Sequence, residues 1–434
     1  MLVTGDMYNE QEHRSLVRFI PYILITVNFV GWEVIKRTPV FVSTTFSQQA
    51  LRIHGVISGL ILLAFTGILF ARFCLAGRSV FHFYRFEKYL YLLLFVDLAA
   101  FLIGLIRHNA TVFLIGDTYK FSVIPLAYFC TTQTLKARDA GKLFLFIVIL
   151  EAAVTLESFG FYAVKLAMGT YERAPQHAIS LLAFIFLMTV LASKDRLSRR
   201  RRNIYSAMLV VIGLTAVLSQ ARTLWVQIFL CPFILMLVER KTAVVRAMFR
   251  PAVVALFLLI PLLLGVSAIY HNVVRDLGGR IAETATLVKT TLSSTSRIVE
   301  AKAALSRYTE SPKALNFVVG MGNGAEFYAP DVALGMGSSP GYKHHIHNGY
   351  VSLFFRMGVV GLIFFFLFAS STLKRTYVVA KLHIRSNVIP AVIFVYFAAT
   401  LIELLTIYSF FGDIKWGILF GIFRCVSLDR EADT

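Results

Sequence analysis

Long apolar runs separated by short polar segments dominate the chain. Runs long enough to cross a bilayer lie at about residues 17–35, 53–75, 89–106, 119–135, 143–168, 177–192, 204–218, 223–238, 251–270, 348–371, 388–410 and 414–427. Because about 20 apolar residues in a helix match the ~30 Å hydrocarbon core, each run predicts one spanning helix. The pattern therefore predicts an all-α fold, a polytopic transmembrane helix bundle with about 12 spans.

One polar segment, from His271 to His347, is much longer than any other. Within it, residues 293–310 carry apolar side chains at helical spacing on one face: Ile298, Ala301, Leu305 and Tyr308. This spacing predicts an amphipathic helix that ends before Pro312. The glycine-rich residues 320–324 are expected to form a flexible turn, with a phosphate-binding loop as the less favoured alternative. The segment is thus predicted to be one long, partly helical loop outside the membrane.

The amino-acid composition excludes a soluble globular protein. Of the 434 residues, 57% are hydrophobic and 15% are charged, and the mean hydropathy is +0.72. The net charge of +19 comes from basic residues clustered between the apolar runs, and no nucleic-acid-binding motif accompanies them. We therefore interpret these charges as topology signals and contacts with membrane lipids, and we expect no nucleic-acid partner.

Lysine and arginine are concentrated in alternate loops, near residues 78–88, 136–142, 194–202, 240–250 and 374–385. Because basic loops stay in the cytoplasm, these five are predicted to face inward. An even number of spans then places both termini in the cytoplasm and the loop 271–347 outside, in the periplasm of a Gram-negative cell. We divide the chain into N-terminal membrane helices, residues 1–203, and a part with the loop and the C-terminal helices, residues 204–434.

Arg222 interrupts the apolar stretch 204–238, in the turn Ser219-Gln220-Ala221-Arg222-Thr223. Two helices that share this stretch reach only ~24 Å each, so the turn is predicted to lie below the outer surface of the membrane. An arginine at that depth costs at least ~2–3 kcal/mol unless it faces a wet cavity or an anion. The N–H donors of its planar guanidinium group match the oxygens of a diphosphate, which makes Arg222 a candidate residue for binding a diphosphate. The alternative is an arginine that reaches up to the lipid headgroups.

The outer loop contains the remaining candidates. Arg297 is expected near the start of the loop helix, where its guanidinium group is either a second ligand for the diphosphate or a solvated surface charge. His344, His345 and His347 resemble a metal cluster by residue type, but they lack the spacing of a helical ligand pair, so no metal site is predicted. His347 lies directly before the next apolar run, where a neutral imidazole can accept a proton from a sugar hydroxyl near pH 7.

Four carboxylates fall inside the apolar runs: Asp97, Glu151, Glu157 and Glu403. A proton- or sodium-coupled transporter needs such groups. They are scattered along the chain and no internal repeat is evident, so pairing with arginine or backbone groups is the favoured interpretation. A transporter or flippase for lipid-linked glycans stays open as an alternative of another class.

An ordered set of motifs resembles a known family. The arginine turn is followed by Ser296-Arg297, by Gly320-Met321-Gly322-Asn323-Gly324, and by His347-Asn348-Gly349-Tyr350 with Arg356-Met357-Gly358-Val359-Val360-Gly361 shortly after. Over about residues 204–371, the set resembles the O-antigen ligase and polymerase family of bacterial inner-membrane glycosyltransferases. The turn has Gln220 and Ala221 where ligases commonly have Ser-x-Ser-Arg.

The resemblance implies a metal-independent transfer, without a cofactor, of an undecaprenyl-diphosphate-linked glycan donor onto an acceptor sugar at the periplasmic side of the inner membrane. Arg222 and Arg297 would bind the diphosphate, and His347 would assist the acceptor hydroxyl. Further substrate-binding residues are expected next to His347 in the sequence: His344, His345, Asn348 and Tyr350. The acceptor is a glycan on a second lipid carrier in a polymerase, which we favour, or lipid A-core in a ligase. A chain-length regulator protein is a further partner of a polymerase.

Overall fold

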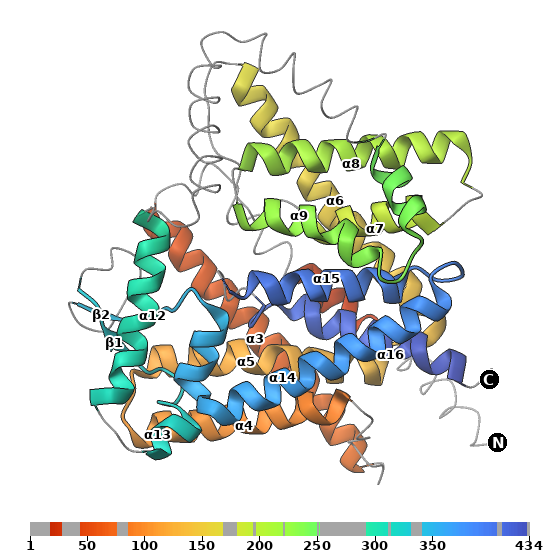
Figure 1. The fold of residues 1–434 in the computed structure, drawn as a ribbon. Helices are drawn as coiled ribbons and strands as arrows, with labels where there is room; N and C mark the ends of the chain where they lie inside the picture. The colour runs from red at the N-terminus through yellow and green to blue at the C-terminus, as the bar shows by residue number, and fades with distance from the viewer. Residues whose placement is uncertain are drawn as a thin grey trace, which may run out of the picture. The chain divides into compact units, whose positions relative to one another are not determined.

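The structure, a computed structural model, is mostly helical (Figure 1) and describes residues 18–27, 44–75, 86–167, 180–193, 197–219, 222–249, 251, 292–310, 314–330, 341–405 and 410–431. The helices are α3 (Thr44–Leu75), α4 (Phe86–Ile106), α5 (Thr111–Thr134), α6 (Ala137–Ala167), α7 (Leu181–Ser193), α8 (Arg199–Ser219), α9 (Arg222–Leu235), α12 (Leu292–Glu310), α13 (Ala314–Val319), α14 (Gly349–His383), α15 (Ile389–Glu403) and α16 (Ile414–Glu431). Strands β1 (Phe327–Tyr328) and β2 (Tyr342–Lys343) form one antiparallel pair.

Within the described part of the chain, four helices are long and apolar enough to cross a membrane: α4, α5, the Ala137–Gly160 part of α6, and α14. Shorter apolar helices lie at Ile57–Ala71, Leu181–Ser193, Thr223–Leu235 and Ile389–Glu403. The predicted helical membrane protein is thus confirmed in its coarse form. The count of about 12 spans stays a prediction, and the predicted run 251–270 lies almost wholly outside the described residues.

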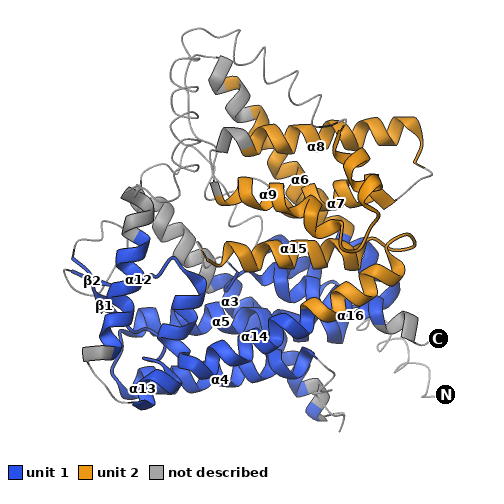
Figure 2. Ribbon diagram, in the orientation of Figure 1, with its two compact units in different colours: residues 1–144, 296–372, 407–434 blue, residues 145–295, 373–406 orange. Residues whose placement is uncertain are grey.

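The chain forms two compact units (Figure 2). Unit 1 comprises residues 1–144, 296–372 and 407–434, and unit 2 comprises residues 145–295 and 373–406. In unit 1, α5 packs against α3, α4 and α16, and in unit 2, α7 and α9 pack against α15. Gly417 and Gly421 lie one turn apart on α16 against α5, where an added Cβ at Gly417 would stand 2.4 Å from the carbonyl oxygen of Ile124. Small residues at this spacing let the two backbones approach closely.

Helix α14 is broken at Gly358, where φ is 63° and ψ is −162°. The Tyr350 ring stacks on Phe366 with 5.7 Å between ring centroids. These residues are 16 positions apart (366 − 350), which corresponds to ~24 Å in a straight helix. The two halves of α14 therefore bend back toward each other. The apolar run 348–371 was predicted as one continuous helix, and this break was not anticipated.

Gly358→Ala is expected to destabilise unit 1 strongly. The backbone at Gly358 lies in a region that only glycine occupies readily, at a cost of roughly 1–3 kcal/mol for other residues. An added Cβ would also stand 2.3 Å from the carbonyl oxygen of Val318. Thermal unfolding of the detergent-solubilised protein measures the change. Gly141→Ala in α6 is the matched control, because nothing lies within 4 Å of its Cβ position and alanine favours a helix by about 0.5–1 kcal/mol. Equal melting temperatures for the two variants would contradict this account.

The predicted loop helix is confirmed as α12, but the apolar face that contains Ile298 and Leu305 is not its buried face. Ile298 is 55% exposed and Leu305 is 38% exposed, whereas Glu300 and Ala304 are 1% and 0% exposed. The inward face is thus centred on a carboxylate and a small residue. Ala304 packs in a cluster with Phe327, Ile346 and other apolar residues of the loop. The orientation of α12 is set by the hydrogen bonds of Glu300 as well as by the burial of apolar side chains. The spacing of apolar residues in the sequence does not reveal such a polar contact.

Candidate functional site

The glycine-rich segment after α13 is a fixed element of unit 1. Gly320, Gly322 and Gly324 all have positive φ, between 76° and 82°. The amides of Met321 and Gly322 donate to the carbonyl oxygens of Phe355 (2.8 Å) and Arg356 (3.0 Å). Those carbonyls lie at the end of the first half of α14, where the break removes their helical partners. The expectation of a flexible turn is therefore wrong, because the segment is buried and closes the end of a helix.

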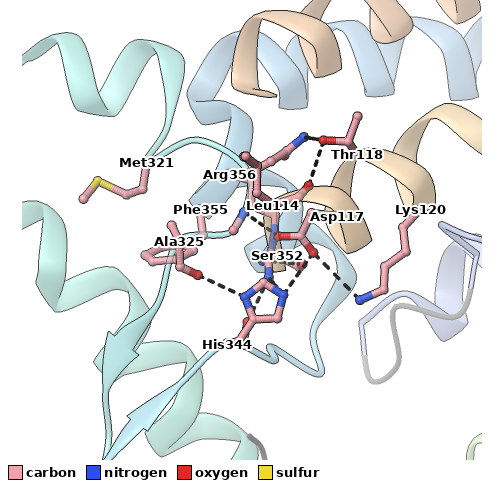
Figure 3. Close-up of polar contacts among 12 residues, drawn as sticks. Leu114, Asp117, Thr118, Lys120, Met321, Ala325, His344, Ser352, Phe355 and Arg356 are labelled. Atoms are coloured by element: carbon pink, nitrogen blue, oxygen red, sulfur yellow. Dashed lines mark hydrogen bonds and ion pairs between the residues drawn. The ribbon is translucent and has the colours of Figure 1, made fainter. Parts of the chain in front are cut away.

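Asp117 of α5 joins three segments of unit 1 (Figure 3). It is 1% exposed and accepts hydrogen bonds from Arg356 Nε, from the Gly324 amide at 2.9 Å, and from His344 Nε2 at 3.2 Å. The Lys120 Nζ lies 3.8 Å from the same carboxylate. Arg356, itself buried, also donates to the carbonyl oxygen of His344 at 2.8 Å. One membrane helix thus fixes the glycine segment, the histidine segment and α14 to one another.

His344 lies inside this cluster. Its Nδ1 lies 3.3 Å from the carbonyl oxygen of Ala325, and its ring stacks on Phe113 with centroids 4.2 Å apart. Burial lowers the pKa of His344, and the hydrogen bond to Asp117 opposes that shift. Both ring nitrogens face groups of the protein. The position of His344 therefore suits a residue that holds the loop better than one that meets substrate, and its predicted substrate contact stays a prediction.

A second polar group surrounds Asp97 of α4. The Asp97 carboxylate accepts hydrogen bonds from Asn323 Nδ2 at 2.7 Å and from Ser122 Oγ at 2.6 Å. The predicted partner, an arginine or the backbone, is therefore wrong for Asp97. In unit 2, Glu151 accepts from Ser180 Oγ, and Glu403 accepts from Gln227 Nε2 at 2.8 Å. The described contacts of these three carboxylates are consistent with structural roles, whereas Glu157 is exposed.

Glu300 of α12 holds His347 by two hydrogen bonds. Its Oε2 accepts from the backbone amide of His347 at 3.0 Å and from Nδ1 of the ring at 2.9 Å. A carboxylate can only accept, so Nδ1 carries the proton in the neutral ring and Nε2 keeps its lone pair. The His347 side chain is 23% exposed and that of Glu300 is 1% exposed. The pair has the geometry of a general base oriented by a buried carboxylate.

Arg297 lies one turn before Glu300 on the same helix. Residues three positions apart in a helix are neighbours on its surface, so Arg297 lies on the side of α12 that carries the Glu300–His347 pair. Its side chain is partly exposed. Two of the three predicted catalytic residues, Arg297 and His347, are thus brought into the same part of unit 1. The residue that connects them, Glu300, was missed by the sequence analysis.

The other predicted residues beside His347 shape the start of α14. Asn348 Oδ1 accepts a hydrogen bond from the Val351 amide at 3.0 Å, as an N-cap residue does. Tyr350 packs on the second half of the broken helix. Burial and neighbouring positive charges lower the pKa of His345 to about 3, so its imidazole is neutral at pH 7. Its ring contacts the ring of His347 edge-on, with centroids 4.6 Å apart. Their contact with substrate stays a prediction.

Arg222 is the first residue of α9 and belongs to unit 2. Its side chain lies outside the described part of the structure. The expectation that Arg222, Arg297 and His347 share one cavity therefore stays a prediction. Among the described residues, no group of three or more His, Cys, Asp or Glu side chains is arranged to hold a metal ion.

The fold and these side chains define a helical membrane protein with a candidate site in its long polar loop. The model of the O-antigen ligase family matches residues 207–366. This match confirms the resemblance to the O-antigen ligase and polymerase family, and the matched stretch contains both Arg297 and His347. An enzyme of ligase or polymerase type in polysaccharide biosynthesis is thereby supported, and the family implies lipid-linked glycan and lipid A-core substrates in general. A search of curated protein sequences finds no match.

Proposed function

We propose that the protein is an inner-membrane glycosyltransferase that polymerises undecaprenyl-diphosphate-linked repeat units into O-antigen or a related surface polysaccharide. The observation that carries this proposal is the Glu300–His347 pair with Arg297 one turn away on α12. A base next to a phosphate-binding side chain is the arrangement that transfer from a diphosphate leaving group to a hydroxyl requires. The site faces the periplasm and both termini lie in the cytoplasm.

In this reaction, Nε2 of His347 accepts the proton of the acceptor hydroxyl. The hydroxyl oxygen forms a bond to the anomeric carbon of the donor glycan, and the bond from that carbon to the diphosphate oxygen breaks. The electron pair leaves with the diphosphate, whose charge the guanidinium groups of Arg297 and Arg222 stabilise. The Glu300 carboxylate stabilises the imidazolium that forms. Because the arginines provide the positive charge, the proposed reaction uses no metal ion.

A ligase is the second candidate, and the name of the matched family, O-antigen ligase, favours it. The same three side chains serve this reaction, and only the acceptor differs. In a ligase the hydroxyl belongs to lipid A-core, whereas in a polymerase it belongs to the terminal sugar of a repeat unit on a second undecaprenyl diphosphate. A chain-length regulator protein is a partner of the polymerase alone.

Deletion of the gene is expected to cause accumulation of glycolipid that carries a single repeat unit. Extracted lipid-linked glycans are separated by size, and restoration of long chains by the intact gene is the control. Long undecaprenyl-linked chains without attachment to lipid A would instead identify a ligase. Glycolipid retained on the cytoplasmic face would identify a flippase.

The purified protein is expected to keep its glycan-transfer activity in EDTA, because the proposed mechanism uses arginines in place of a metal ion. A loss of activity that Mg²⁺ or Zn²⁺ restores would contradict this metal-free mechanism.

A further inference from the structure

Helix α13 turns apolar side chains outward. Leu315 is 65% exposed, Phe317 is 54% exposed and Val318 is 44% exposed, whereas the polar residue Asn316 is 5% exposed. This distribution is the reverse of what a short helix in a water-exposed loop adopts. Neighbouring large apolar side chains exposed together indicate a surface that another apolar phase covers.

The position of α13 is fixed by Arg107, the residue that follows α4. The Arg107 guanidinium donates to Oδ1 of Asn316 and to the carbonyl oxygen of Gly320, the latter at 3.2 Å. Figure 1 shows α13 beside this end of α4. Because Asn316 is the buried residue of α13, these hydrogen bonds orient the opposite, apolar side of the helix outward. The depth of α13 relative to a bilayer therefore follows from the depth of the α4 end.

Helix α4 has 21 residues, about 31 Å at 1.5 Å per residue, which matches the ~30 Å hydrocarbon core. Its last residue, Ile106, thus reaches the membrane interface. Near this end, Leu102 is 57% exposed, Leu105 is 47% exposed and Ile106 is 77% exposed. In a spanning helix such side chains face lipid. The exposed side of α13 lies at the same level as this lipid-facing surface.

We propose that α13 is a membrane-contacting helix that rests in the interface of the leaflet at the Ile106 end of α4. Leu315, Phe317 and Val318 lie among the upper parts of the acyl chains. The Phe317 ring packs edge-on against Tyr308 of α12, at 6.4 Å between centroids, and against Phe354 of α14, at 5.3 Å. Contact with lipid at α13 therefore sets the height of α12 above the membrane. This inference concerns lipid binding and does not depend on the proposed reaction.

Tryptophan placed on α13 tests the contact. Phe317→Trp and Leu315→Trp are reconstituted in nanodiscs of phosphatidylcholine, either unmodified or brominated near the carbonyl end or near the middle of the acyl chains. The fluorescence that each new tryptophan adds to the parent protein is expected to shift to the blue. Bromine near the carbonyl end is expected to quench it more than bromine at mid-chain. Leu315→Trp keeps the ring contacts of Phe317 intact, so it remains informative if Phe317→Trp misfolds.

Ile106→Trp, at the exposed end of α4, is the positive control for lipid quenching. Quenching at Leu315 comparable to that at Ile106 supports the proposal. Quenching by aqueous iodide in place of bromolipid shows that α13 faces water and overturns it. A blue-shifted emission that neither agent quenches shows that another protein surface covers α13, which also overturns it. The proposal fails as well if bromolipid leaves Ile106→Trp unquenched, because the end of α4 then lies outside the membrane.

Discussion

Glu300→Gln is expected to lower the turnover of glycan transfer by about 10²-fold, toward the ~10²–10⁴-fold loss that follows removal of a general base. Oε2 of Glu300 accepts from both the amide and the Nδ1 of His347. Glutamine offers one acceptor oxygen and an NH₂ group. A glutamine oxygen in the position of Oε2 keeps both hydrogen bonds, so the tautomer of His347 is retained. The uncharged amide, however, does not stabilise the imidazolium that forms when Nε2 takes the proton of the acceptor hydroxyl.

Two measurements separate this positioning role from a loss of fold. The Michaelis constant for the lipid-linked donor is expected to stay close to that of the parent while kcat falls. The ¹⁵N chemical shifts of His347 are expected to show the same tautomer as in the parent protein, which reports an intact site. Glu326→Gln is the matched control, because it makes the same substitution at a partly exposed carboxylate of the same loop. Full activity of Glu300→Gln would refute the role of this residue.

Asp117→Asn is expected to destabilise unit 1 by roughly 3–5 kcal/mol, the usual cost of removing one partner from a buried ion pair. Arg356 is 2% exposed and keeps its charge without the carboxylate. Three donors converge on the two carboxylate oxygens, from Arg356, His344 and Gly324. An asparagine has one acceptor oxygen, so its NH₂ group meets a donor or leaves one unsatisfied. Thermal unfolding in detergent measures the effect.

Asp139→Asn in α6 serves as the control for this substitution. The Asp139 carboxylate, 17% exposed, pairs with Lys142 at 3.4 Å and Arg138 at 3.7 Å, whose side chains are 77% and 71% exposed. A pair of this kind is worth about 0–1 kcal/mol, so the melting temperature is expected to change little. Similar small shifts for both variants would show that the Asp117 cluster contributes little to stability.

The helical membrane class, the loop helix and the residues Arg297 and His347 were accessible from the sequence. Hydropathy reveals apolar runs, and arginine and histidine in a long polar loop point to phosphate and proton chemistry by residue type. Glu300 was missed because a single glutamate in an amphipathic helix has the same pattern as a solvated charge. Its spacing of three residues from Arg297 is the signal that could have identified it.

The Asp117 cluster and the break in α14 depend on contacts between distant segments. Asp117 and Arg356 lie 239 positions apart in the chain, and no local pattern couples them. Gly358 follows Arg356 in an apolar run whose composition is typical of a continuous span. The backbone of Gly358 packs closely against the backbone of Val318 and Gly320, with no room for a side chain. These two residues lie far from Gly358 in the sequence, so a window of neighbouring residues does not contain them. Tertiary contacts therefore decide both features.

The short β1–β2 pair separates changes of length in the long polar loop from the proposed base. The Ala329 amide donates to the carbonyl oxygen of Gly341 at 2.8 Å, which closes the stem beside the two strands. After the stem, His344 is tied to α5, and His347 is tied to Glu300. Residues inserted or deleted between Ala329 and Gly341 thus leave the position of His347 relative to Glu300 unchanged.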